Sequence, residues 1–215
     1  MTPTDRHEGL FISFEGIDGS GKSTQVTRLA EHLRAKGHEV VVTREPGGSA
    51  GAEEIRALVL QGAPDRWSAE TEILLFTAAR RDHLERVIRP ALAAGQIVIC
   101  DRFADSTRMY QGLSRGDLRP IVDRLHDLMI NIEPDLTVLI DMNPVEGLKR
   151  AKGRQGVEER FEDFGADLQK AMRAGFLALA KEFPDRIRVI NGAQDIDGVA
   201  ADISAATDAA LEQCA

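Results

Sequence analysis

The chain has 215 residues, of which 43% are apolar, and a formal net charge of −8. This length and apolar content fit one α/β domain with a sizeable core, so we expect residues 1–215 to form a single domain. The acidic charge argues against nonspecific binding to nucleic acid or to acidic membranes.

No apolar run reaches membrane-spanning length, and the N-terminus lacks the basic and then apolar plan of a signal peptide. The two cysteines, Cys100 and Cys214, suggest no disulfide framework. We therefore expect a cytoplasmic protein with no membrane partner.

The first predicted strand, residues 10–14, leads directly into a glycine-rich segment and then a helix. The segment matches the phosphate-loop pattern G-x-x-x-x-G-K-[ST] and reads Gly16-Ile17-Asp18-Gly19-Ser20-Gly21-Lys22-Ser23. A helical face follows at Val26, Leu29, Ala30 and Leu33, and Gly37 is its expected end. The flanking strand and helix disfavour a chance match in an ordinary turn. The loop N–H groups and the helix N-terminus therefore predict a nucleoside triphosphate site, with Lys22 on the β- and γ-phosphates and Ser23 on Mg²⁺.

Strands and helices alternate along the rest of the chain. Apolar or β-branched runs predict strands at 40–43, 97–100, 136–140 and 187–190. Helical patterns cover 51–61, about 69–94, and a last helix that carries Ile196, Val199, Ala200 and Ile203. The run 97–100 does not alternate, which indicates burial on both faces. We expect a five-stranded parallel sheet with helices on both faces and ligands beyond the C-terminal ends of its strands.

That rule gathers the charged residues at the ends of the first four strands, which are Asp18, Arg44, Asp101 with Arg102, and Asp141. An arginine at such a position can hold a phosphate bidentately, and Asp101 can hold Mg²⁺ or orient an arginine. The ordinary alternative for Arg44, taken alone, is a surface residue before a turn.

A basic cluster follows the fourth strand and contains Lys149, Arg150, Lys152 and Arg154. Together with Gly153 and Gly156 it is typical of a short lid over the phosphoryl group, at about 149–161. The ordinary alternative is a solvated helix face.

Five spaced motifs make the chain similar to the bacterial type of thymidylate (dTMP) kinase, a family of P-loop nucleoside monophosphate kinases. They are FEGIDGSGKSTQ at 14–25, TREPGGS at 43–49, EILLFTAARRDHL at 72–84, DRFADSTRMYQG at 101–112 and GLKRAKGRQGVEERFED at 147–163. The similarity implies transfer of the ATP γ-phosphoryl group to dTMP, giving dTDP for dTTP synthesis and DNA replication. It also implies Mg²⁺ as cofactor and a homodimer formed through helices beside the sheet.

The resemblance also implies roles for single residues. Asp18 approaches the sugar 3′-hydroxyl, Arg44 and Arg102 hold the phosphate of dTMP, Phe76 stacks on thymine, and Arg80 donates to its O4. The remaining residues of the dTMP site are Ser106, Thr107, Tyr110 and Gln111. The ATP site that the resemblance implies comprises loop residues 16–23, Thr24 and Arg150. The metal site comprises Ser23 and Asp101. The catalytic residues are Asp18, Lys22, Arg102 and Arg154.

Three of these assignments have alternatives. Phe76 alone suits a core position, but Arg80 on the same helix face argues against one, because an unpaired guanidinium does not belong in a core. Tyr110, expected to exclude a ribose 2′-hydroxyl with its ring, could instead lie on a helix surface. Gly19 stands where some relatives carry an arginine, so we expect basic lid residues, chiefly Arg150 and Arg154, to supply that charge. Arg154 is the expected catalytic residue, and Arg150 and Lys152 are the alternatives to it.

Other functions stay open at this point. The nearest alternative is a kinase for another nucleoside monophosphate or for a deoxynucleoside. A GTP-dependent switch would need an N-K-x-D motif, and none of the asparagines is followed by lysine. A nucleic-acid-dependent ATPase is disfavoured by the acidic charge.

Overall fold

The computed structural model describes residues 8–63, 66–113, 116–152 and 165–214. Five strands form one sheet in the order β2-β3-β1-β4-β5, and every neighbouring pair is parallel. The strands are β1 (Leu10–Glu15), β2 (Val40–Arg44), β3 (Ile97–Asp101), β4 (Leu136–Asp141) and β5 (Ile187–Asn191). The five-stranded parallel sheet is thus confirmed. Each strand extends one residue beyond its predicted C-terminal end, and that residue is always polar.

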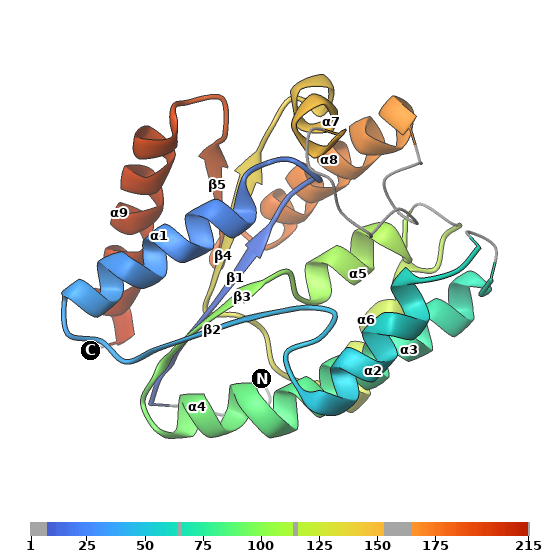
Figure 1. Ribbon diagram of the computed structural model, residues 1–215, viewed down its shortest axis with the longest axis horizontal. Helices are drawn as coiled ribbons and strands as arrows, with labels where there is room; N and C mark the ends of the chain where they lie inside the picture. The colour runs from blue at the N-terminus through green and yellow to red at the C-terminus, as the bar shows by residue number, and fades with distance from the viewer. Residues whose placement is uncertain (1–7, 64–65, 114–115, 153–164, 215) are drawn as a thin grey trace.

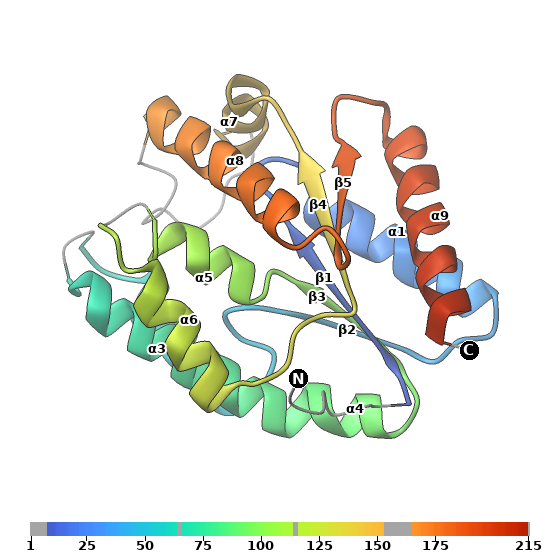
Figure 2. The same ribbon diagram turned by 180° about the vertical axis from the view of Figure 1, so that it is seen from behind.

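Helices cover both faces of this sheet (Figures 1 and 2). On one face lie α1 (Lys22–Ala35) and α9 (Ile196–Cys214), which pack against each other. The other face is covered by α4 (Arg89–Ala93), α5 (Ala104–Tyr110), α6 (Arg119–Met129) and α8 (Gly165–Glu182). Two further helices, α2 (Ala50–Leu60) and α7 (Pro144–Lys152), pack on α3 (Ala69–His83) and on α8 respectively.

Burial on both faces explains why the central strands show no polar alternation. Along β1, Ile12 and Phe14 pack with α1 and α9, whereas Phe11 enters a second core with Leu84 and Ile88. β3 is buried through its first four residues in the same way. Apolar packing on both faces therefore fixes the C-terminal edge of the sheet, where the polar residues lie.

The helix predicted over about 69–94 contains an irregularity. α3 ends at His83, a π-helical turn η1 (Leu84–Ile88) follows, and α4 continues to Ala93. The N–H of Arg89 donates to the carbonyl of Leu84, five residues back, and Pro90 has no N–H to donate to Arg86. The proline gives a physical reason for the wider turn.

Two other expectations concern the lid and the membrane. The lid predicted at about 149–161 falls mostly on residues 153–164, outside the described part of the chain, and residues 149–152 end α7. Arg154 is among the residues not described.

Across the described ranges, no helix combines the length and apolar content that crossing a bilayer requires.

Candidate active site

The phosphate loop connects β1, the central strand, to α1 at the C-terminal edge of the sheet. Gly16 has φ +135°, and a Cβ there would lie 2.7 Å from the carbonyl oxygen of Ile140, so a side chain does not fit. Nζ of Lys22 donates to the carbonyl oxygens of Gly16 at 3.0 Å and of Ile17 at 2.9 Å. The ammonium group is therefore held within the loop.

The charge of Lys22 is sensitive to this environment. Burial, together with the neighbouring charge of Arg102, lowers the pKa of Lys22 to about 8, although Asp18 and Asp101 act in the opposite direction. The charged form is thus easily lost in mildly alkaline solution.

Nucleotide affinity should therefore fall as the pH rises above about 8. Phosphate favours the charged ammonium, so binding is at full strength below that pKa and weakens by up to about tenfold per pH unit above it. Calorimetric measurement of the Kd for ADP between pH 7.5 and 9.5 checks this, with Lys22→Ala as the control that should show no such slope. Equal slopes for both proteins would contradict it.

Ser23 and Asp101, the two predicted metal ligands, lie together at the mouth of the loop. Ser23 Oγ donates to Asp101 Oδ2 at 2.7 Å. The pairing of Phe14 with Asp101 in the sheet brings β3 to this position beside the loop. A hydroxyl and a carboxylate are hard oxygen ligands, and Mg²⁺ commonly takes one or two protein oxygens while keeping several waters. The pair fits a magnesium site.

Asp18 is directed at cationic and phenolic donors. Its carboxylate accepts hydrogen bonds from Arg102 Nη2 and, at 2.9 Å, from the Tyr110 hydroxyl. Burial acts to raise the pKa of Asp18, but Arg102, Lys22 and Tyr110 outweigh it, so the pKa lies below its ordinary value. Asp18 is thereby held ionised, and its interactions inside the phosphate loop are attractive.

Arg102 reaches Asp18 from a strained backbone. It has φ +71°, in the left-handed region that costs a non-glycine residue about 1–3 kcal/mol. Its N–H donates to Phe14 O at 2.9 Å, and its carbonyl accepts from Cys100 Sγ at 3.0 Å. Its Nη1 donates to Ser106 Oγ at 3.0 Å. Such strain, held by surrounding bonds, is typical of functional sites.

These groups line a cavity of about 540 Å³. Of the residues predicted from sequence, it is lined by Asp18, Gly19, Gly21, Lys22, Ser23, Arg44, Phe76, Arg80, Asp101, Arg102, Ser106, Thr107, Tyr110 and Gln111. The predicted ATP-site residues that do not line it are Gly16, Ile17, Ser20, Thr24 and Arg150. Among the residues that the structure describes, the charged side chains of its lining are five cations, Lys22, Arg44, Arg56, Arg80 and Arg102, against three carboxylates, Asp18, Glu45 and Asp101. Cations therefore outnumber carboxylates at this cavity, although the chain as a whole is acidic.

Phe76 and Arg80 from α3 also line the cavity. Phe76 is only partly buried and lines the cavity, so it is not a closed core residue. Arg80 is 4% exposed and is not the unpaired guanidinium that the sequence suggested. Its Nε donates to Glu45 Oε2 at 2.7 Å, which corrects that argument because a paired guanidinium can be buried.

Several residues at this site were not singled out from the sequence. Glu15, the last residue of β1, accepts from the N–H of Phe103 at 2.8 Å and from Ser106 Oγ at 2.6 Å. Burial and the nearby Asp105 raise the pKa of Glu15 to about 7. Arg56 lines the cavity from α2. The only available signal for Glu15 was its position as the polar end of an apolar strand.

Two charged residues at strand ends form other contacts. Arg44 is exposed and pairs with Glu53 at 3.1 Å, although it also lines the cavity. Asp141 does not line the cavity and binds Arg173 through both oxygens, at 2.6 and 2.8 Å. Position at the end of a strand was therefore not enough to place Asp141 in the site.

A central strand that leads into a phosphate loop, beside a cationic cavity with a hydrogen-bonded hydroxyl and carboxylate, is the arrangement of a P-loop nucleotide-binding protein. A family model described as thymidylate kinase matches residues 14–203. The chain is 76% identical over 196 residues to thymidylate kinase of Ruegeria pomeroyi, covering 91% of this chain and 93% of that protein. It is 64% identical to that of Dinoroseobacter shibae, covering 92% and 95%.

A solved structure gives the same answer. The crystal structure of thymidylate kinase from Ehrlichia chaffeensis matches with a TM-score of 0.75 at 37% identity, covering 93% of this chain and 98% of that one. The chain belongs to the thymidylate kinase family.

Proposed function

We propose that the protein transfers the γ-phosphoryl group of ATP to dTMP, giving ADP and dTDP in the presence of Mg²⁺. The observation that carries this is one cavity that is lined both by residues of the phosphate loop and by Phe76 and Arg80. A phosphoryl donor and a nucleobase acceptor can thus lie in a single continuous site.

On the donor side, the loop N–H groups and Lys22 bind the phosphates of ATP. Ser23 and Asp101 hold Mg²⁺, which when bound neutralises phosphate oxygens. Arg150 is exposed on α7, and its role, like that of Arg154, rests on the resemblance.

On the acceptor side, Arg44 and Arg102 hold the phosphate of dTMP, and Asp18 accepts from the sugar 3′-hydroxyl. Phe76 stacks on the base and Arg80 donates to O4, while Ser106, Thr107 and Gln111 complete the wall. The acceptor is an ionised phosphate, so no strong general base is needed. Alignment and charge neutralisation supply the catalysis.

Labelled ATP tests this reaction directly. Incubation with γ-³²P-ATP, Mg²⁺ and dTMP should place the label in dTDP, as seen by chromatography. A parallel reaction with AMP in place of dTMP is the control for the nearest alternative activity. No labelled dTDP, or faster labelling of ADP from AMP, would contradict the proposal.

Replacement of Tyr110 should separate its ring from its hydroxyl. Tyr110→Ala should raise kcat/KM for ribothymidine monophosphate relative to dTMP, because the ring no longer excludes the 2′-hydroxyl. Tyr110→Phe should keep the exclusion but raise the KM for dTMP severalfold, because Asp18 loses the bond at 2.9 Å. Steady-state kinetics with both nucleotides checks this. An unchanged ratio in Tyr110→Ala would assign sugar selection to another residue.

We also propose a homodimer formed through α3 and α6. Large apolar side chains are exposed on these packed helices, with Leu74 58%, Ile121 44% and Leu128 69% accessible. Exposed apolar groups on neighbouring elements are typical of an interface. Light scattering should give a molar mass of twice the chain mass of 23.5 kDa. In the double variant Leu74→Asp, Leu128→Asp the measured molar mass should fall to that of a single chain.

The same structure supports two simpler proposals. All five strands belong to one sheet, as a single domain over residues 1–215 would require. Cys100 is a free, buried thiol, which suits the reducing cytoplasm.

A further inference from the structure

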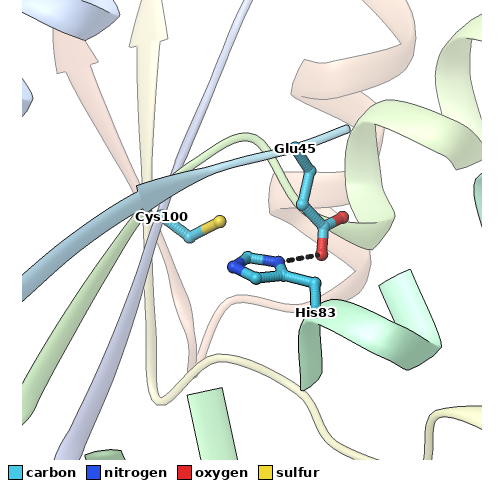
Figure 3. A group of neighbouring side chains, drawn as sticks. All are labelled: Glu45, His83 and Cys100. Atoms are coloured by element: carbon cyan, nitrogen blue, oxygen red, sulfur yellow. Dashed lines mark hydrogen bonds and ion pairs between the residues drawn. The ribbon is translucent and has the colours of Figure 1, made fainter. Parts of the chain in front are cut away.

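A buried group of polar side chains adjoins Arg80 at the wall of the cavity. Glu45 follows β2, His83 ends α3 and Cys100 lies in β3, and Figure 3 shows the Glu45 carboxylate directed at the His83 ring. His83 and Cys100 are 0% exposed and Glu45 is 6% exposed. Polar groups buried to this degree find their partners within the protein.

One chain of hydrogen bonds links this group to Arg80. Glu45 Oε2 accepts from Arg80 Nε at 2.7 Å, and Oε1 lies 3.1 Å from His83 Nδ1. A carboxylate paired with a guanidinium is an acceptor, so Nδ1 carries the proton. His83 Nε2 then accepts from the Thr43 hydroxyl at 2.7 Å. The guanidinium and the imidazole therefore both donate to Glu45, each to a different carboxylate oxygen.

The guanidinium of Arg80 is fixed on its other sides as well. Nη2 donates to Thr107 Oγ1 at 3.0 Å, and the group lies 5.1 Å from the ring centre of Phe103. Among the described residues, none accepts a hydrogen bond from Nη1. Because Arg80 lines the cavity, Nη1 is the donor available to a ligand.

The three side chains of Figure 3 offer ligand atoms within 4.8 Å of one another, which raises the question of a metal site. Both Glu45 oxygens and both His83 nitrogens already take part in hydrogen bonds. Burial raises the pKa of the Cys100 thiol well above its usual range, whereas a metal requires the thiolate. A bound cation would also lie beside the charge of Arg80. The arrangement favours positioning over metal binding.

The backbone is shaped around the imidazole. A Cβ on Gly48 would lie 2.4 Å from His83 Nε2 and 2.4 Å from Thr43 Oγ1, at a residue with φ +89°. A side chain at this position would break the bond between them. The second glycine of TREPGGS thus makes room for the last link of the chain of bonds.

We infer that Glu45 and His83 are positioning residues that fix Arg80 for discrimination among bases in the acceptor site. The inference rests on the proposed function. A fixed donor favours a base with an acceptor at this place, such as thymine O4, over cytosine with its amino group. A guanidinium free to rotate would lose this preference.

The test measures kcat and KM separately for dTMP and dCMP. Glu45→Gln and His83→Leu should raise the KM for dTMP about tenfold and lower the dTMP to dCMP ratio of kcat/KM by a similar factor. The kcat for dTMP should change much less, because the phosphate loop is untouched. His83→Asn keeps a donor at the position of Nδ1, so it should restore the wild-type ratio to within about twofold.

The matched control is His126→Leu. His126 is 5% exposed and lies 3.1 Å from Glu133, so it is a second buried histidine beside a glutamate, and it does not line the cavity. Its replacement should lower the melting temperature and leave the ratio unchanged.

The outcomes separate the inference from the proposed function. Wild-type protein without activity on dTMP would refute the function itself. Active wild type, with unchanged KM and ratio in Glu45→Gln and His83→Leu, would overturn the inference, as would an equal loss in His83→Asn and His83→Leu. If His83→Leu does not fold, the inference is tested with Glu45→Gln, which is isosteric with the wild type, and with His83→Asn. Glu45→Gln should raise the KM for dTMP and lower the dTMP to dCMP ratio, His83→Asn should leave the ratio near the wild-type value, and an unchanged ratio in Glu45→Gln would overturn the inference.

Discussion

Lys22→Ala should lower kcat by about 10²-fold or more while the fold survives. Nζ is the charge held within the phosphate loop, and alanine suits the first turn of α1. The loss in kcat should add to the loss of nucleotide affinity that removal of the ammonium causes, because charge on the transferred group peaks in the transition state. Kinetics at saturating ATP and dTMP, with a melting curve for the fold, measures it.

Lys36→Ala is the matched control for this change. Lys36 follows the same helix but pairs with Asp208 on the surface, at 2.7 Å. It should leave kcat unchanged. A folded Lys22→Ala protein with normal kcat would remove the phosphate loop from the mechanism.

Arg102→Ala should have an effect of the same size or larger, about 10²- to 10³-fold on kcat/KM for dTMP. The guanidinium binds Asp18, Ser106 Oγ and the carbonyl of Gly16, so its removal leaves a buried carboxylate without its cation. The pKa of Asp18 should then rise, since Arg102 is the largest influence that lowers it. We therefore expect the KM for dTMP to rise and kcat to fall.

Arg102→Lys tests whether charge or geometry matters. Lysine keeps the charge but lacks the planar fork that binds two partners at once, so it should recover only part of the activity. Activity in Arg102→Ala within about threefold of wild type would show that Arg44 alone holds the acceptor phosphate.

The sequence was sufficient to predict the sheet, the phosphate loop and most residues that line the cavity. These depend on local spacing and on the rule that parallel strands end at one edge, which brings Ser23 to Asp101 across 78 positions. The rule failed for Asp141, because Arg173 from α8 binds its carboxylate.

Other features depend on packing that no local pattern contains. Glu45 and His83 are 38 positions apart and meet only when α3 lies beside β2, so the buried partner of Arg80 was not predictable. The left-handed backbone of Arg102 is likewise held by tertiary contacts, since its N–H donates to the carbonyl of Phe14. These tertiary contacts determine the exact positions of the Arg80 and Arg102 side chains in the site.

The most direct test of the whole account is the set of kcat/KM values for dTMP, dUMP, dCMP, AMP and ribothymidine monophosphate with ATP and Mg²⁺. The account predicts the highest value for dTMP, with lower values for dCMP through Arg80 and for the ribonucleotide through Tyr110. A higher value for AMP or dCMP than for dTMP would contradict it.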